Sequence, residues 1–278
     1  MRQLLLLVLL CGLVSADIDC GRTPVSPNQN LIVGGKLAKP GSWPWQVYVC
    51  GEADDGRCHI RCGGTLIDEQ WVLTSGQCID HYTDTPAIIG VKAGVYNYHS
   101  DYEADEEEFL AEAIYLHPQY NSPKQFSHDL GLIKLQSPVQ FNTRIQPVCI
   151  PKSLDNLVHI GTVGYITGWG SIYEGGPVSN QLRQAAVPFV DINVCQAAYP
   201  GQIDPDTMEC AGKQGVDGCY DDNGGPLVVK HADTGLWYQA GIMSFKEGCA
   251  RKVGVYSKPS VMCDFIEKTV RKKICKSV

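Results

Sequence analysis

Short apolar runs rich in Val, Ile, Thr, Tyr and Trp recur along most of the chain, and Gly, Pro, Asn and Asp separate them. Runs of this length and composition, bounded by turn residues, are typical of β-strands. The clearest of them cover residues 45–49, 65–67, 71–74, 130–135, 165–167, 227–229, 237–244 and 254–256. This spacing predicts an all-β sandwich or barrel rather than alternating βαβ units.

The end of the chain has a different pattern, in which apolar residues recur at helical spacing: Met262, Ile266, Val270 and Ile274. They predict a terminal helix bracketed by Cys263 and Cys275. An unbroken helix between these two cysteines would hold their Cα atoms about 18 Å apart, whereas a disulfide requires about 4.4–6.8 Å. If they bond to each other, the helix must end before Cys275. Otherwise each pairs elsewhere, or Cys275 forms an intermolecular bond.

The first residues combine a basic start at Arg2, a short apolar run at 4–10 and small residues at 14–16. This pattern predicts a secretory signal peptide over residues 1–16, because the apolar run is too short to span a bilayer. No later stretch reaches 18 consecutive apolar residues. We therefore expect a secreted, extracellular protein with no membrane span.

Composition narrows the classes of partner and cofactor. The chain has 23 Lys and Arg against 30 Asp and Glu, a net charge of −7, so nucleic acid is not an expected partner. Of its 13 cysteines, Cys11 lies in the predicted signal peptide. An even number remains, which in an exported chain favours disulfides over metal sites. We expect no cofactor. Cys50 and Cys58 flank a short Gly/Asp loop and are a plausible hairpin disulfide.

Several longer motifs are more specific. They are Ile-Val-Gly-Gly at 32–35, Trp-Pro-Trp-Gln-Val at 43–47, Cys-Gly-Gly-Thr-Leu-Ile at 62–67, His-Asp-Leu-Gly-Leu-Ile-Lys-Leu at 128–135 and Tyr-Ile-Thr-Gly-Trp-Gly at 165–170. Their sequences and order resemble the trypsin/chymotrypsin family of serine proteases. The resemblance implies two six-stranded antiparallel β-barrels with a C-terminal α-helix. It also implies a propeptide-like segment at 17–31 before the protease-like domain at 32–278.

Two positions of the family's catalytic triad carry amides here. The motif at 71–78 is similar to one that ends in Ala-Ala-His-Cys in the family, but Gln77 replaces the histidine. The loop at 219–226 resembles the family's active-site loop, but Asn223 replaces the nucleophilic serine. An amide does not titrate near neutral pH and supplies no nucleophile. Asp129 matches the triad aspartate, and we expect it to hold backbone N–H groups or the Gln77 amide.

A third departure lies beside the site where a protease stabilises the oxyanion. Asp221 stands where the family has Gly, and its carboxylate has the wrong charge for that role. We therefore expect an inactive homologue that serves as a binding or regulatory protein. Its partner would be a protease, an inhibitor, a zymogen or a surface protein. The alternatives are a structural or extracellular-matrix protein and a residual trypsin-like endopeptidase.

The resemblance also implies an activation latch between the amino group of Ile32 and the carboxylate of Asp222. Leu31 precedes Ile32, and a trypsin-like activator would not cut after leucine. Two possibilities remain open. Either the chain stays intact and its pocket is loosely formed, or another enzyme processes it.

The substrate pocket of the family corresponds here to Asp217, Ser244 and Lys246. In trypsin-like members, the residue matching Asp217 binds a basic side chain, and Ser244 matches a serine near the triad aspartate. Lys246 stands where the family has Gly. Our hypothesis is that Lys246 fills the pocket and pairs with Asp217. The alternative is that it points into water.

Further expectations concern disulfides and calcium. The resemblance implies the pairs Cys20–Cys149, Cys62–Cys78, Cys195–Cys210 and Cys219–Cys249. The acidic segment at 101–108 is a weak candidate for Ca²⁺ through Asp101, Glu103, Asp105 and Glu106. Val95 stands where calcium-binding relatives begin the site with Glu, so we favour a solvated acidic loop and expect no metal.

Overall fold

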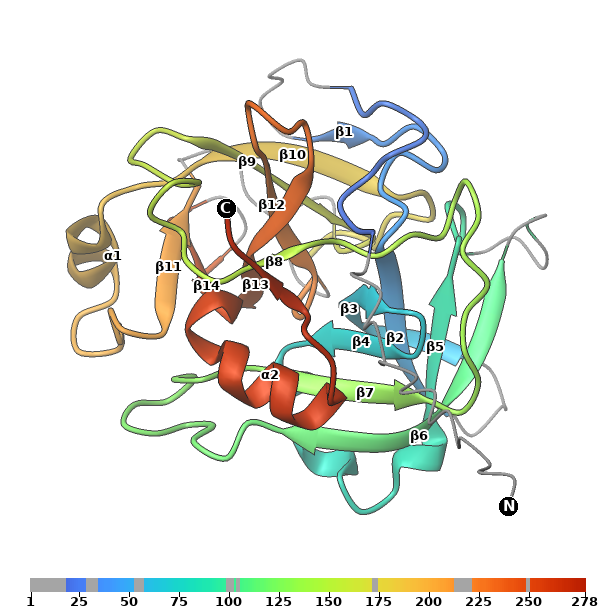
Figure 1. Cartoon of the computed structure of the whole chain (residues 1–278). Helices are drawn as coiled ribbons and strands as arrows, with labels where there is room; N and C mark the ends of the chain where they lie inside the picture. Colours follow the sequence, from blue (N-terminus) through green and yellow to red (C-terminus); the bar gives the residue numbers. More distant parts are fainter. Residues whose placement is uncertain are drawn as a thin grey trace, which may run out of the picture.

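The structure, a computed structural model, describes residues 19–28, 35–52, 58–98, 103, 106–171, 175–212, 222–248 and 251–278, without the side chains of 52 and 58–61. The signal-peptide prediction lies outside these residues. Figure 1 shows the strands gathered in two units, with the terminal helix packed beside them. Within the described part of the chain, no helix has the length and apolar character needed to cross a membrane.

The N-terminal unit is a closed antiparallel barrel in the order β2-β3-β4-β7-β6-β5. The alternating inward residues of its strands pack into one apolar cluster that includes Val47, Leu66, Val91 and Ile133. Its strands are β2 (Gln46–Glu52), β3 (Cys58–Asp68), β4 (Trp71–Thr74), β5 (Ile89–Ala93), β6 (Glu107–Leu116) and β7 (Gly131–Leu135). The six-stranded barrel that the resemblance implied is thus present.

The C-terminal unit is a seven-stranded sheet in the order β1-β10-β9-β12-β13-β14-β11. It has one strand more than expected, because the short β1 pairs with the outer edge of β10. An antiparallel bridge between Phe189 and Ala211 brings the end of β10 to β11, so the other six strands curl into a barrel. The strands are β1 (Lys36–Leu37), β9 (Val163–Gly168), β10 (Arg183–Pro188), β11 (Met208–Ala211), β12 (Pro226–Lys230), β13 (Trp237–Phe245) and β14 (Gly254–Ser257).

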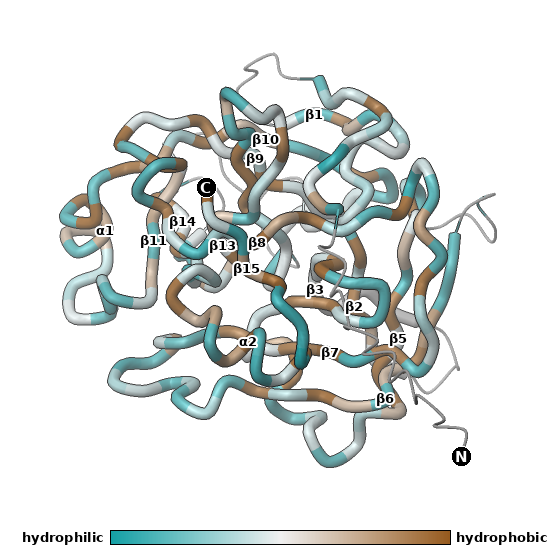
Figure 2. The backbone as a smooth tube through the Cα atoms, in the orientation of Figure 1, coloured by the Kyte–Doolittle hydropathy of each residue, from teal (hydrophilic) through white to brown (hydrophobic). Residues whose placement is uncertain are grey.

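The two units share an aromatic core. Trp43 contacts Trp45, Tyr165 and Trp237, with ring centroids 6.0, 5.6 and 5.0 Å away. All four side chains are buried, and they come from both halves of the chain. Figure 2 shows apolar residues recurring along the strands of both units. Burial of large aromatic side chains therefore holds the units together.

The helices are few and short. They are η1 (Gly76–Cys78), η2 (Asp80–Tyr82), η3 (Pro86–Ile88), α1 (Ile192–Ala198), η4 (Pro259–Met262) and α2 (Cys263–Val270). The prediction that the terminal helix continues to Ile274 is wrong, because Arg271 has a φ of 60° and ends α2. The chain then turns back, and β15 (Cys275–Lys276) pairs in parallel with β8 (Ile150–Pro151). Ile274 is still buried, but from this tail.

The described disulfides close three short segments of the chain and, between Cys20 and Cys149, join two distant ones. The reversal after α2 brings the Cα atoms of Cys263 and Cys275 to 6.1 Å, and the two cysteines are bonded. The structure also contains Cys20–Cys149, Cys62–Cys78 and Cys195–Cys210, three of the pairs that the resemblance implies. Cys50 is disulfide-bonded. The Cys58 side chain and the pair Cys219–Cys249 lie outside the description.

Candidate functional site

Four polar residues meet where the two units face each other. Gln77 lies in η1 directly after β4, and Asp129 precedes β7 in the same barrel. Asn223 lies just before β12, and Ser244 lies near the end of β13, both in the C-terminal unit. We call these four residues the amide cluster. The structure therefore brings together Gln77, Asp129, Asn223 and Ser244, which the sequence placed in separate motifs.

The carboxamide of Gln77 is hydrogen-bonded at both of its polar atoms. Its Nε2 donates to Asp129 Oδ2 at 2.8 Å and to the backbone oxygen of Ser244 at 2.7 Å. Its Oε1 accepts from Asn223 Nδ2 at 3.3 Å. Both Nε2 hydrogens and one oxygen lone pair are thus used. The side chain is fixed in an orientation that links both barrels.

Asp129 is fully buried and surrounded by donors. Its Oδ1 accepts from the backbone N of Gln77 at 2.9 Å, and its Oδ2 accepts from Ser244 Oγ at 2.5 Å. Burial raises the pKa of Asp129, while these donors and the backbone of Gly76 act to lower it. Donors that favour the carboxylate are what allow a buried aspartate to be accommodated. Asp129 therefore holds both the amide and the backbone, as the sequence led us to expect.

The loop that carries Asn223 is pinned against the N-terminal barrel. The backbone oxygen of Asn223 accepts from Gly63 N at 2.7 Å. Gly224 follows with a φ of +80°, and a Cβ there would lie 2.2 Å from Thr74 Oγ1. Only glycine fits this approach. The contact fixes the position of Asn223 opposite Gln77.

The side chain of Asp222, next to Asn223, packs against the backbone at Gly168 and Gly170. Its Oδ1 accepts from Gly170 N at 2.8 Å, and the residue is 9% exposed. A Cβ on Gly168 would lie 1.9 Å from the same oxygen, so glycine is required there as well. The other members of the predicted latch and oxyanion region, Ile32 and Asp221, lie outside the described residues.

Lys246 is directed into the protein. Its Nζ is buried, which does not match the alternative that it points into water. Asp217, its hypothetical partner, lies outside the described part of the chain. Phe245, immediately before Lys246, is half-buried and stacks on Phe126 with centroids 5.2 Å apart. Phe126 was missed from the sequence, because no pattern signals an aromatic residue in a loop two positions before His128.

In the acidic segment, the carboxylates of Glu103 and Glu106 bond to other groups of the protein. Glu103 accepts from the backbone N of Tyr96 and of Asn97, each at 2.7 Å. Glu106 pairs with the Lys92 ammonium at 3.0 Å. These carboxylates are therefore already bonded to protein donors.

The remaining calcium candidates, Asp101 and Asp105, lie outside the described residues. Among the residues that are described, no group of three or more His, Cys, Asp or Glu side chains is placed to hold a metal. The pairing of Glu106 with Lys92 and the backbone contacts of Glu103 do not fit a calcium site built from these two side chains.

Comparison with known proteins gives the family. Residues 32–266 match the family model described as Trypsin. The chain belongs to the trypsin family. It is 35% identical over 268 residues to "Serine proteinase stubble" of Drosophila melanogaster, covering 92% of this chain and 33% of that protein. It is 30% identical over 274 residues to "Ovochymase" of Halocynthia roretzi, covering 96% of this chain and 16% of that protein. The chain thus spans a third or less of these relatives' length, and its all-β trypsin-like fold is confirmed.

Proposed function

We propose that this trypsin-family chain is a secreted protein without proteolytic activity, and that it serves as a binding or regulatory protein. The observation that carries the proposal is the Gln77 carboxamide. It stands where the family has its general base and is hydrogen-bonded to Asp129, Ser244 and Asn223.

The chemistry of acyl transfer supports the inactive half of the proposal. A serine protease needs a base that takes a proton from the nucleophile and returns it to the leaving amine. An amide does neither near neutral pH, and Asn223 supplies no hydroxyl for attack. Asp221 adds a negative charge beside the expected oxyanion. Each of these three residues alone would interrupt a different part of the mechanism.

An aromatic pair at the surface supports the second part of the proposal, a role in binding. Phe245, directly after Ser244, and Phe126, in the loop before β7, form a stacked, half-buried aromatic pair. Aromatic residues are enriched in protein–protein interfaces. The described disulfides brace the fold and are typical of exported chains. The partner would be a protease, an inhibitor, a zymogen or a surface protein.

The test of inactivity is incubation of the purified protein with a defined peptide mixture, followed by mass spectrometry of new termini. We expect no cleavage above the buffer control. Cleavage that co-purifies with the protein and disappears in Asn223→Ala would contradict the proposal and favour a residual endopeptidase.

A further inference from the structure

Two adjoining cavities lie on the C-terminal unit, formed by residues outside the amide cluster. One has a volume of about 290 Å³ and lies between the turn after β8, β11 and η4. The other has a volume of about 670 Å³ and extends from the same turn to the start of α1. Val158 and Glu209 line both. The cavities therefore adjoin at these two residues, and we call them together the Glu209 groove.

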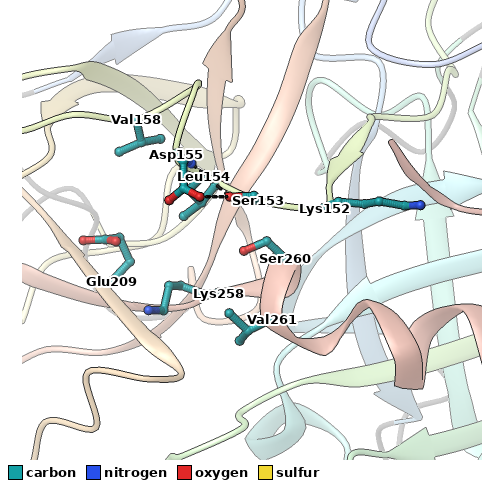
Figure 3. Close-up of a pocket in the computed structure, with 9 residues that line it drawn as sticks. All are labelled: Lys152, Ser153, Leu154, Asp155, Val158, Glu209, Lys258, Ser260 and Val261. Carbon is teal, nitrogen blue, oxygen red and sulfur yellow. Dashed lines mark hydrogen bonds between the residues drawn. The ribbon is translucent and has the colours of Figure 1, made fainter. Parts of the chain in front are cut away.

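The polar side chains that line the smaller cavity differ in how available they are to a ligand. Figure 3 shows Lys152 directed away from the other labelled side chains. Asp155 accepts from Ser153 Oγ at 2.7 Å. Lys258 donates from Nζ to the backbone oxygen of Pro205 at 2.7 Å, so its ammonium is already engaged. The second cavity adds Asp191 and no Lys or Arg among its lining residues.

Glu209 is the residue that joins the two cavities. Its Oε1 accepts from the backbone N of Cys210 at 3.1 Å, which leaves the second carboxylate oxygen to the groove. Burial raises the pKa of Glu209, and the nearby Lys258 charge acts to lower it. A carboxylate that has lost part of its hydration gains more from a cationic partner than one in open water.

Apolar side chains also line both cavities. Ile160, which lines the larger cavity, is 72% exposed, and Val261, which lines the smaller one, is 55% exposed. Exposed aliphatic side chains at the edge of a concave site can pack against a bound ligand, while the polar groups of the site fix its orientation. The groove thus combines exposed aliphatic side chains with three carboxylates, those of Glu209, Asp155 and Asp191. Asp191 also caps α1, where its Oδ1 accepts from Asn193 N at 2.8 Å.

We propose that the Glu209 groove binds a segment of a partner protein that presents an Arg or Lys beside an aliphatic side chain. The cationic head pairs with Glu209, and the aliphatic side chain packs on Ile160 or Val261. This inference rests on the proposed binding function and names a surface for it. The charge of the groove selects a basic segment over an acidic one.

Lys258 allows the sign of the ligand to be tested. Its ammonium competes with a cationic ligand for the field of Glu209, so Lys258→Met increases the affinity for such a ligand several-fold. An anionic ligand would use Lys258 directly, and the same substitution would weaken it. The two classes of ligand therefore respond in opposite directions.

The experiment uses the full secreted chain and two probes, acetyl-Leu-Arg-Leu-amide and the same peptide with citrulline in place of arginine. Binding is followed by chemical-shift changes of methyl groups in labelled protein. The arginine peptide should shift Ile160, Val158 and Val261 and bind at least about tenfold more tightly than the citrulline peptide. Glu209→Gln should remove this preference, because its amide oxygen still accepts from Cys210 N while its charge is gone.

The matched control is Asp233→Asn, which removes an exposed carboxylate from the β12–β13 turn and should leave both affinities unchanged. Equal binding of the two peptides, or weaker arginine-peptide binding in Lys258→Met, overturns the proposal. Chemical-shift changes confined to residues near Gln77 and Phe245 would also overturn it. These results would leave the peptide-cleavage result unaffected, so failure of the groove and failure of the proposed inactivity are distinguishable.

Discussion

At position 77 one side chain makes contacts to both barrels. The Gln77 amide reaches Asp129 in its own barrel and the Ser244 backbone and Asn223 in the other. An imidazole has two ring nitrogens, each bearing at most one hydrogen, whereas the Gln amide offers two hydrogens on one nitrogen and an acceptor oxygen. The Gln77 amide is therefore suited to a static hydrogen-bonded link between the barrels.

Gln77→Ala should lower the free energy of unfolding by about 1–3 kcal/mol, because it leaves buried groups of the amide cluster without partners. Urea unfolding with disulfides intact measures this. Gln136→Ala, at an exposed position, should change stability by less than about 0.5 kcal/mol. Equal effects of the two substitutions would mean that the amide cluster adds little to stability.

Lys246→Gly should open a pocket for cations, because our hypothesis is that the Lys246 side chain, whose Nζ is buried, fills the substrate pocket. We expect p-aminobenzamidine to bind the variant and not the natural protein, measured by fluorescence. Lys273→Gly, which removes an exposed lysine from the tail, serves as the control. Failure of Lys246→Gly to bind the probe would refute the hypothesis that Lys246 fills the pocket.

At the scale of elements, strand prediction succeeded where aromatic and β-branched residues occur together. Residues 71–74 match β4, and 237–244 lie within β13. β6 was missed, because Glu, Ala and Leu in its sequence favour helix. It is a strand because β5 and β7 pair with it on its two sides. β10 and β11 were missed for a similar reason, since neither has a clear β-branched run.

The segment before β7 contains a buried histidine that contacts α2. His117 is buried, stacks on His128 with centroids 4.7 Å apart and contacts the Phe265 ring edge-on. Burial, and secondarily the charge of His128, lower the pKa of His117 from 6.5 to about 4. The unfolded chain binds this proton near pH 6.5, and the folded protein binds it only near pH 4. The free energy of unfolding therefore falls as the pH drops through this window.

His117→Asn removes this contribution. As the pH falls from 6.5 to 4, the variant should therefore lose less free energy of unfolding than the natural protein does. Urea unfolding at several pH values measures the difference. His159→Asn, at an exposed histidine, should run parallel to the natural protein. If the free energy of unfolding of His117→Asn depends on pH in the same way as that of the natural protein, His117 does not carry the pH dependence.

The Cys263–Cys275 disulfide closes the reversal that ends α2 and holds β15 beside β8. For a loop of this size, removal of the bond should cost up to about 3 kcal/mol. Cys263→Ser/Cys275→Ser should therefore lower the Tm and speed proteolysis after Arg271. Lys273→Ala in the same tail should leave both unchanged. A double variant with the natural Tm would mean that strand pairing alone holds the tail.

At the scale of the molecule, motif order was enough to predict the family and the meeting of Gln77, Asp129, Asn223 and Ser244. It could not give the direction of each hydrogen bond, because side-chain orientation depends on packing from both barrels. The Phe126–Phe245 stack and the Glu209 groove were also beyond prediction. Both join residues distant in sequence that carry no pattern of their own.

The most direct test of the account is labelling with a fluorophosphonate, which reacts with an activated serine. The natural protein is compared with Gln77→His/Asp221→Gly/Asn223→Ser on the same backbone, both processed before Ile32. Heat-denatured samples control for surface reaction. The account predicts that the natural protein stays unlabelled and that the reconstructed protein is labelled at position 223. Specific labelling of the natural protein would contradict the account, and mass spectrometry of the labelled peptide would then locate its nucleophile.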